Sequence, residues 1–485
     1  MELHKIIYDL LLSQIKFGTY KFKDPLPKMD DISQWFSVSL DTVKAAYHQL
    51  KKEGYITLTK KAGAAVAIQF EEAEIDRNIQ TFFSPRKDAV IDLCQSFTPL
   101  FSHVLWYGMK NAGTVQLDEL ERLCSQQKIL RPYIIVQRIH LIYGSLKNDL
   151  LLRLIWQAFL FCQAPFMSLP ANIVDLKDYN IPLLDMINLC RKKDWDGLWK
   201  TVTYSQAHIT SAIQWFYQYY ITPSKNEVPV SFHWNAYQNS SQRCYSLGID
   251  ILKGIRLGIF AQDGFLPPPA KIAEYMQVSA ITVRRTIKMQ NQLGVTQSIN
   301  GVGTKILSVE HSMENCDFNQ PLIQKRLLNF AQSLQILAMT CAACMKSVLT
   351  NPSAVDMWKK RLAYTKENFR YESVVYASVE IIPRYTQNQT MQQIYEHLVC
   401  FLLWGYPLRS MHGSREEINK FYLPYLNFFL EKLDSCDWDG LTDVLENLLF
   451  YELQFAVTRL DELGVKNVTS LLFPGLNVSP APPEH

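Results

Sequence analysis

The sequence predicts a mainly α-helical protein built from two small modules, each of which precedes a larger all-helical domain. Three observations lead to this fold class. Two stretches have the pattern of a pair of short helices followed by a glycine-containing hairpin. The two stretches are separated by a constant offset of 240 residues. The roughly 165 residues after each stretch have helical periodicity and few strand signals.

The clearer module runs from Leu266 to Thr304. Its first helix is expected to have an apolar face made of Ile272, Ala273, Tyr275 and Met276. Ser279 is placed to cap the second helix, which turns Val283 and Ile287 inward. The opposite side of that helix carries Ile281, Arg284, Arg285 and Lys288. With the hairpin tip at residues 300–303, this layout is typical of a winged helix-turn-helix, whose second helix enters a DNA groove.

A second copy of the pattern argues against reading the basic face as ordinary solvated surface. The offset of 240 residues relates Leu26-Pro27, Val38-Ser39, Thr42-Val43, Gly54 and Gly63 to Leu266-Pro267, Val278-Ser279, Thr282-Val283, Gly294 and Gly303. A constant offset over a whole motif indicates an internal duplication. In the first copy we expect helices at 3–17, 29–36 and 40–53, and wing strands at 55–58 and 64–68.

The length of 485 residues exceeds what one hydrophobic core supports, so several domains are expected. We place winged helix-turn-helix domains at 1–72 and 238–310, and all-helical domains at 73–237 and 311–485. An acidic linker is expected at 69–77, a polar crossover at 222–239 and a disordered tail at 477–485. The apolar run 150–167 is interrupted by polar residues, which favours a buried helix over a membrane span.

Each all-helical domain is predicted to contain six helices in the same order. They cover residues 87–112, 117–124, 132–146, 149–163, 176–193 and 197–220, and then 321–350, 354–366, 372–385, 391–405, 415–436 and 440–463. The segment Asp-Trp-Asp-Gly-Leu at 194–198 recurs at 437–441, so these domains are duplicated too. We expect Asp196 and Asp439 to cap the following helices, and a buried tryptophan to fix each corner.

Charge is distributed unevenly along the chain, although the net charge is only +3. Residues 1–70 contain 10 Lys and Arg against 7 Asp and Glu, and residues 241–307 contain 8 against 3. The remaining segments are therefore acidic. Basic modules attached to an acidic body are the expected split for a nucleic-acid-binding protein with separate partner domains.

The layout resembles the winged-helix DNA-binding domain of the GntR family of bacterial transcription regulators. The second copy matches the family pattern at Leu266-Pro267, Val278-Ser279, Thr282-Val283-Arg284 and the Gly-x-Gly-Thr wing at 301–304. The first copy has Lys44 in place of the arginine and only Gly63 in the wing. Both copies lack the Ser-Glu-Arg that follows the Leu-Pro turn, and have Leu40 and Ala280 where the family has a further arginine. DNA backbone contacts are implied, but base readout does not carry over.

We use the word reader for a winged-helix domain that is expected to bind DNA. A reader of this type followed by an all-helical domain resembles the FadR-like branch, whose helical domain binds a small effector and forms the dimer. The resemblance implies a DNA-binding transcription regulator, and the duplication predicts that it is built as a covalent pseudo-dimer. Its expected partners are double-stranded DNA and a small-molecule effector of unknown identity, and a homo-oligomer of the pseudo-dimer remains open. The effector would change operator affinity by a population shift. Because the two readers differ, we expect a non-palindromic operator or one bound mainly through the second reader.

The residues expected to contact DNA lie on the two recognition helices and the two wings. They are Lys44, His48, Lys51, Lys60 and Lys61 in the first copy, and Ile281, Thr282, Arg284, Arg285, Lys288, Asn300, Gly301, Gly303 and Thr304 in the second. Arg153, Trp156 and Glu396, all within apolar helices, are the candidates for an effector pocket.

Metal and cofactor sites are not expected. FadR-like domains often hold a metal through an Asp and several His, and His103, His140 and His208 form a candidate set on three helices. The register differs from the family, however, because Ile139 stands at the family's histidine position. The pair Cys341 and Cys344 is expected to be buried within an apolar helix. No phosphate loop or nucleophile motif favours an enzyme.

A rival reading is a winged-helix scaffold that has lost DNA reading and acts through protein contacts, since several family arginines are missing. Ten cysteines without a disulfide framework, and a start without a signal-like segment, lead us to expect a cytoplasmic protein without membrane contact.

Overall fold

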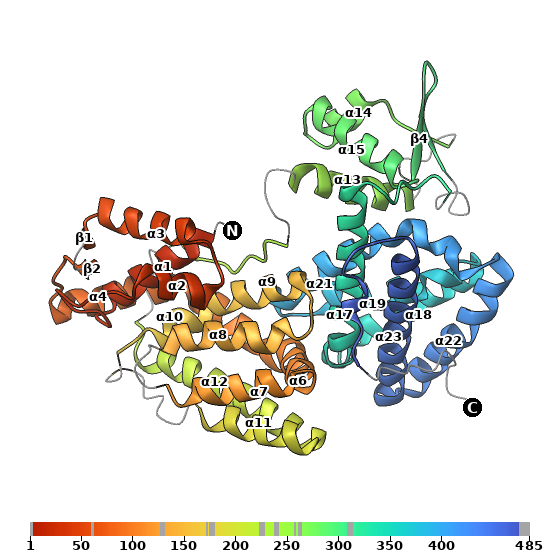
Figure 1. Ribbon diagram of the computed structural model, residues 1–485. Coiled ribbons are helices and arrows are strands. Elements are labelled where there is room, and N and C mark those ends of the chain that lie inside the picture. The colour runs from red at the N-terminus through yellow and green to blue at the C-terminus, as the bar shows by residue number, and fades with distance from the viewer. Residues whose placement is uncertain are drawn as a thin grey trace. The chain divides into compact units, whose positions relative to one another are not determined.

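The computed structural model describes residues 3–59, 63–126, 131–170, 173, 180–222, 228–236, 242–256, 259, 264–307 and 314–474. The chain divides into two compact units. Unit 1 comprises residues 1–235 with 388–390, and unit 2 comprises residues 236–387 with 391–485. Both units are mainly helical, as the sequence predicts (Figure 1).

Unit 1 begins with a winged helix-turn-helix, which we name module 1. Its elements are α1 (Leu3–Lys16), α2 (Met29–Phe36), α3 (Leu40–Lys52), β1 (Ile56–Thr59) and β2 (Gly63–Val66). The two strands pair antiparallel, with Ile56 opposite Val66. Leu11, Ile32, Val43 and Leu50 are fully buried, because helical spacing turns them to one side of their helices. The predicted helix pair and wing are confirmed to within two residues.

The acidic linker predicted at 69–77 is wrong. Most of it belongs to helix α4 (Glu72–Phe83), which closes module 1 against the body of unit 1. The Glu74 side chain caps the start of the helix by accepting a hydrogen bond from the Glu71 backbone N–H at 2.9 Å. Ile79 and Phe83, one turn apart, are buried. The acidic residues therefore favour a helix start, where they also meet the positive end of the helix dipole.

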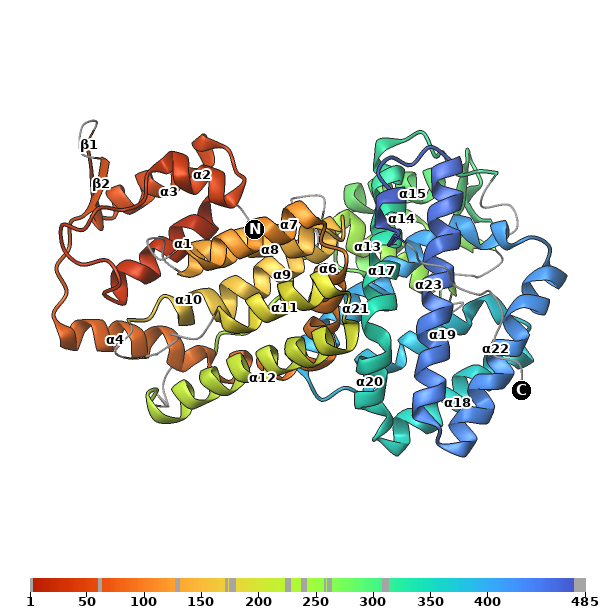
Figure 2. The ribbon, with the colours of Figure 1, turned by 60° about the horizontal axis from the view of Figure 1, so that its bottom comes forward.

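The body of unit 1 is an irregular helical bundle in which α8 and α9 lie side by side (Figures 1 and 2). Its elements are η1 (Ser84–Arg86), α5 (Lys87–Gln95), η2 (Phe97–Phe101), α6 (Ser102–Lys110), α7 (Thr114–Cys124), α8 (Arg131–Gly144), α9 (Asp149–Ala158), η3 (Phe159–Gln163), α10 (Ala164–Met167), α11 (Ile181–Lys192) and α12 (Trp195–Tyr219). The single helix predicted at 87–112 is interrupted by the π-helical turn η2, because Pro99 has no N–H to donate within the helix. A second π-helical turn, η3, carries the helix predicted at 149–163 on to Met167.

Residues 228–235 of the segment predicted as a polar crossover belong to unit 1 and pack within it. The Val230 N–H donates to the Pro85 carbonyl at 2.8 Å, and the Asn235 N–H donates to Gln157 Oε1 at 2.8 Å. Phe232 and Trp234 are buried. These apolar contacts, which the polar composition concealed, hold the segment in place.

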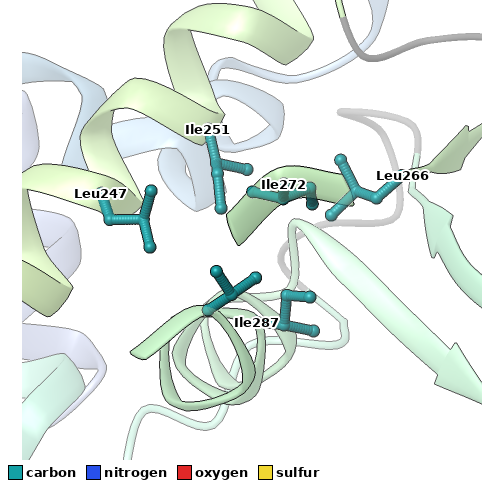
Figure 3. Packing of buried hydrophobic residues seen from close by; sticks show 6 residues of the cluster. Leu247, Ile251, Leu266, Ile272 and Ile287 are labelled. Carbon is teal, nitrogen blue, oxygen red and sulfur yellow. The ribbon is translucent and has the colours of Figure 1, made fainter. Parts of the chain in front are cut away.

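Unit 2 begins with a second small group of elements, which we name module 2. They are α13 (Gln242–Arg256), β3 (Phe265–Leu266), α14 (Pro269–Tyr275), α15 (Ala280–Gln292), β4 (Thr296–Ile299) and β5 (Gly303–Ile306). The strands form an antiparallel sheet in the order β3-β5-β4. Figure 3 shows Leu247 and Ile251 of α13 packed against Leu266, Ile272 and Ile287, so every helix contributes to the core. Tyr275, predicted to face inward, is 70% exposed because its position on the short α14 points away from this core.

The body of unit 2 contains a long central helix pair, α17 (Pro321–Leu349) and α23 (Trp438–Glu462), which lie side by side (Figures 1 and 2). The remaining elements are α18 (Pro352–Glu367), η4 (Tyr371–Ser373), α19 (Val374–Val379), α20 (Ile381–Tyr385), α21 (Gln389–Leu402), η5 (Leu403–His412), α22 (Arg415–Ser435) and η6 (Thr469–Leu471). The helix predicted at 372–385 divides at Glu380, because Pro383 cannot donate to the preceding turn. Cys341 and Cys344 are fully buried in α17, which confirms that prediction.

Two helical stretches, Asp149–Met167 and Pro321–Leu349, are long and apolar enough to cross a membrane. Of their most apolar windows, 67% and 83% respectively are buried inside the protein, as in core helices.

The repeated Asp-Trp-Asp-Gly-Leu corners cap α12 and α23, but through Asp194 and Asp437, which accept hydrogen bonds from the N–H groups of Gly197 and Gly440. The prediction of Asp196 and Asp439 is wrong by half a turn, since each helix begins at the tryptophan, which is only partly buried.

Candidate nucleic-acid interface

The second helices of the two modules start with the same hydrogen-bonded cap. Ser39 Oγ accepts the Thr42 N–H at 3.2 Å, and Ser279 Oγ accepts the Thr282 N–H at 3.1 Å. In both, the serine and threonine hydroxyls lie 2.8 Å apart. A serine cap satisfies a backbone donor that the first helical turn leaves unpaired. Thr282, expected to contact DNA, therefore already serves the start of its helix.

Helix α15 separates an apolar side from a cationic one. Val283 and Ile287 are buried in the core of module 2, as predicted. Arg284, Arg285 and Lys288 are exposed, and Ile281 beside them is 60% exposed. Among the residues that the structure describes, no carboxylate lies within ion-pair distance of these three cations. Their donors can therefore meet phosphate oxygens without first breaking an ion pair.

Helix α3 presents a weaker version of this face. Lys44, His48 and Lys51 are exposed, as expected. Lys44 Nζ, however, donates a hydrogen bond to Asp41 Oδ1 at 3.1 Å. A phosphate would have to compete with this carboxylate and would also be repelled by it.

The wing of module 2 is a tight hairpin whose tip is Asn300-Gly301-Val302. The Val302 N–H donates to the Ile299 carbonyl at 3.1 Å, and Ile299 pairs with Gly303 across the hairpin. Gly301 and Gly303 have φ values of 74° and 144°, which favour glycine. Asn300, Gly301 and Gly303 are exposed, and Thr304 is half-buried with its hydroxyl 3.3 Å from that of Ser298. Of module 1's wing, Gly63 has a φ of 72°, while Lys60 and Lys61 lie outside the described residues.

Residues 3–66 match the sequence model of the family described as bacterial regulatory proteins, gntR family. This match spans α1, the helix pair and both wing strands of module 1. Residues 3–66 therefore form a GntR-type helix-turn-helix domain. Members of that family are DNA-binding transcription regulators, so the GntR match assigns module 1 to that class of domain.

Comparison with solved structures gives distant likenesses. McbR/YncC of E. coli is 15% identical, with a TM-score of 0.23 and coverage of 45% of this chain and 99% of that one. A GntR-family regulator of Pseudomonas syringae is 16% identical, with a TM-score of 0.22 and coverage of 44% and 86%. The Lar regulator of Listeria monocytogenes is 14% identical, with a TM-score of 0.19 and coverage of 46% and 98%. No curated protein matches the sequence.

The GntR domain of module 1 is anchored to the body of unit 1 by an aromatic cluster that the sequence did not reveal. The ring of Phe36 stacks on Trp156 at 5.8 Å, and Trp35 packs on Tyr133 at 5.2 Å. Tyr133 Oη donates to Gln14 Oε1 at 2.6 Å. The ring centroids of His140 and Trp156 are 5.2 Å apart. Burial lowers the pKa of His140, although its hydrogen bond to the Phe36 backbone acts in the opposite direction. Trp156, which we expected in an effector pocket, instead packs on Phe36 and holds module 1 against the body of unit 1.

A cavity of about 590 Å³ opens instead between α8, α11 and α12 of unit 1. Its mostly apolar wall includes Ile139, Met186 and Ile209, and its polar groups include Arg138 and His208. Arg138 is nearly fully buried and donates to Asn180 Oδ1 at 2.7 Å. Neither Arg153 nor Trp156 is among the described residues that line it. Arg153 is partly buried on α9, where burial lowers its pKa despite Asp149. Helical periodicity alone could not tell which polar residue of an apolar helix faces a cavity.

The three histidines of the alternative metal set have separate surroundings. His103 packs on Trp199 at 4.4 Å, His140 on Trp156, and His208 on Tyr204 at 6.1 Å. Within the described residues, no group of three or more His, Cys, Asp or Glu side chains is arranged to hold a metal ion. Glu396, the third effector candidate, does line a cavity, one of about 540 Å³ in unit 2.

Proposed function

We propose that this protein is a GntR-type transcription regulator that carries two DNA readers in one chain, as a covalent pseudo-dimer. Module 1 supplies one reader through its GntR domain. Module 2 supplies the other, with Arg284, Arg285 and Lys288 on the exposed side of α15. This cationic helix face beside a glycine-rich wing is the observation that carries the proposal.

The internal duplication on which the pseudo-dimer rests is supported by matching elements in the two units. Helices α3 and α15 both have 13 residues, start at equivalent caps and lie 240 residues apart. Helices α12 and α23 both have 25 residues and start at the repeated Asp-Trp corner, 243 residues apart. Equivalent elements with conserved lengths are expected when one gene segment has been copied. The two readers would then contact separate half-sites, about one DNA turn apart.

A small effector would bind within the helical bodies and change the affinity for the operator. The cavity of about 590 Å³ between α8, α11 and α12 supports this part of the proposal. Its size lies within the usual range of roughly 300–1,000 Å³ for ligand pockets, and its apolar wall with a few polar groups is typical of them. Arg138 and His208 replace Arg153 and Trp156 as the polar and aromatic candidates for ligand contact.

The scaffold alternative is favoured by one observation, the pairing of Lys44 with Asp41 on the recognition helix of module 1. A reader whose cation is held by its own carboxylate would grip DNA poorly. In that case the winged helices would serve as protein-docking units.

A salt titration of DNA binding separates these functions. We expect the affinity for a fluorescein-labelled duplex, measured by anisotropy, to fall steeply with salt. The double variant Arg284→Ala, Lys288→Ala should bind more weakly, with the slope of log affinity against log salt reduced by about 2, since each phosphate contact contributes about 0.9. Lys360→Ala, which removes an exposed cation of α18, is the matched control and should leave both values unchanged. Absence of binding at low salt, or an unaltered double variant, would favour the scaffold.

A further inference from the structure

A cavity of about 540 Å³ lies where module 2 meets the body of unit 2. One wall is α13, the first helix of module 2, and the other walls come from α18 to α21 of the body. The lining residues are Ser246, Ile249, Asp250, Lys253, Arg361, Tyr376, Glu380, Pro383, Arg384, Gln392, Glu396, His397, Val399 and Cys400. The cavity therefore lies between α13, a helix of module 2, and the helical body of unit 2.

The charged groups of this cavity are separated between its walls. On α18 and α20, Arg361 and Arg384 flank Glu380, so this wall carries one excess positive charge. Arg384 donates to Glu380 Oε1 at 2.6 Å, whereas the nearest guanidinium nitrogen of Arg361 is 3.8 Å from Glu380 Oε2. Because 3.8 Å is too long for a hydrogen bond, the Arg361–Glu380 pair does not use the donors of Arg361.

The wall formed by α21 carries the opposite charge. Glu396 contributes a carboxylate that accepts one hydrogen bond, from Gln392 Nε2 at 3.2 Å. Burial lowers the pKa of His397, so the neutral form of this side chain prevails at pH 7. On α13, Asp250 and Lys253 carry opposite charges, and the Lys253 side chain is hydrogen-bonded to Cys400 of α21. The lining thus offers a ligand two arginines, from α18 and α20, and a carboxylate from α21.

In unit 1, aromatic rings fill the space between α2 of module 1 and the body. Under the duplication proposed above, the offset of 240 residues makes His140 equivalent in sequence to Glu380, and Trp156 equivalent to Glu396. In unit 1 these two rings pack on each other, and Trp156 also stacks on Phe36 of the reader. Unit 2 has carboxylates at both positions and a cavity beside its reader. The two bodies therefore meet their modules differently: α2 stacks on the body in unit 1, whereas α13 borders a cavity with room for a polar ligand in unit 2.

We propose that the cavity at the base of module 2 binds a small zwitterion of the α-amino-acid class. The ligand carboxylate would lie against Arg361 and Arg384, and its ammonium group against Glu396. Each group would then form a charge-assisted hydrogen bond. The net neutrality of the lining side chains matches a ligand without net charge, and the volume leaves space for its side chain.

Binding here acts on the DNA reader through α13. Leu247 and Ile251 of this helix belong to the core of module 2, while Asp250 and Lys253 line the cavity. A ligand held between α13 and α21 fixes the helix on which module 2 is built. This regulatory step rests on the proposed function, because it requires module 2 to bind DNA, whereas ligand binding itself does not.

The ligand site is tested on the full chain with the twenty standard L-amino acids, each added alone, by thermal shift and then by calorimetry. At least one should bind saturably with a 1:1 ratio. Its N-acetyl derivative, which lacks the ammonium, and its amide, which lacks the carboxylate, should each bind at least about 10-fold more weakly, because each loses one charge-assisted hydrogen bond. Glu396→Gln and Arg361→Gln should weaken binding by a similar factor. Glu367→Gln, an exposed carboxylate of α18 outside the cavity, is the control and should bind normally.

Several results overturn the ligand proposal. They are the absence of saturable binding by any of the twenty amino acids, equal binding of the singly charged derivatives, and unchanged binding in both cavity variants. Glu396 is exposed, so its variant should melt like the wild type without ligand and separate a binding defect from a folding defect. Duplex affinity is measured in parallel with and without the bound amino acid, and a change of about fivefold or more is expected. DNA binding without ligand binding would contradict only this inference. Ligand binding without DNA binding would contradict only the proposed function.

Discussion

Asp41 holds Lys44 on the recognition helix of module 1, with 3.1 Å between Oδ1 and Nζ. At the equivalent positions of module 2 stand Ile281 and Arg284, which cannot form such a pair. Helix α3 thus presents a partly neutralised face, and helix α15 a cationic one. This carboxylate, together with Ala45 and His48 in place of Arg285 and Lys288, is the basis of the unequal DNA affinities that we propose for the two readers.

Asp41→Asn should strengthen DNA binding by module 1. The change releases Lys44 and removes a negative charge from the face that would approach phosphates. Exposed ion pairs are worth about 0.2–1 kcal/mol, so duplex affinity at low salt should rise up to about fivefold. Anisotropy measurements on the Arg284→Ala, Lys288→Ala background isolate the effect. Glu72→Gln on α4 is the matched control, and an equal gain in that variant would mean that net charge alone is responsible.

Ile287→Ala should destabilise module 2, whereas Ile281→Ala should not. Ile287 is 5% exposed in the core and Ile281 is 60% exposed on the same helix. Removing a buried isoleucine side chain costs about 2–5 kcal/mol, and an exposed substitution changes stability by about 0.5 kcal/mol or less. Chemical denaturation with hydrogen exchange of the α15 amides measures both. Similar losses for the two variants would contradict the assignment of the inner and outer faces of α15.

Lowering the pH should loosen the junction between module 1 and its body. Burial between the reader and the body depresses the pKa of His140 below its ordinary 6.5. The unfolded chain then binds more protons than the folded chain between the two pKa values, so stability rises with pH there. The contribution of His140 is complete above about pH 6.5 and is lost as the pH falls through the folded-state pKa.

Thermal melting between about pH 5.5 and 7.5 checks this prediction. The wild type should lose stability toward the acid end, and His140→Gln should flatten that dependence because glutamine does not titrate. His208→Gln, at an exposed position on α12, should keep the wild-type profile. The account fails if His140→Gln retains the full acid sensitivity.

The local parts of the fold could be predicted from the sequence because their signals lie within a few residues. The helical spacing of Val283 and Ile287 predicts α15, and a serine cap before each helix predicts the starts of α3 and α15 almost to the residue. Helix α4 is not evident from the sequence because its acidic first turn, which is capped through the Glu74 carboxylate, resembles a polar linker in composition.

Contacts between distant segments could not be predicted in the same way. Trp156 and Arg153 lie on the same apolar helix. Trp156 packs on Phe36, 120 residues away in the sequence, whereas Arg153 is not among the described residues that line the cavity of unit 1. Of the three effector candidates, only Glu396 lines a described cavity. Periodicity indicates which face of a helix is inward, but it does not reveal whether another side chain or a cavity meets that face.

The central claim, two readers of unequal strength in one chain, is tested most directly by a hydroxyl-radical footprint. The duplex would be selected by the full-length protein from a random pool. We predict two protected segments about one DNA turn apart with unequal protection, the stronger of which disappears in the Arg284→Ala, Lys288→Ala variant. Equal protection of two identical inverted half-sites, or a footprint unchanged by that variant, would contradict the account.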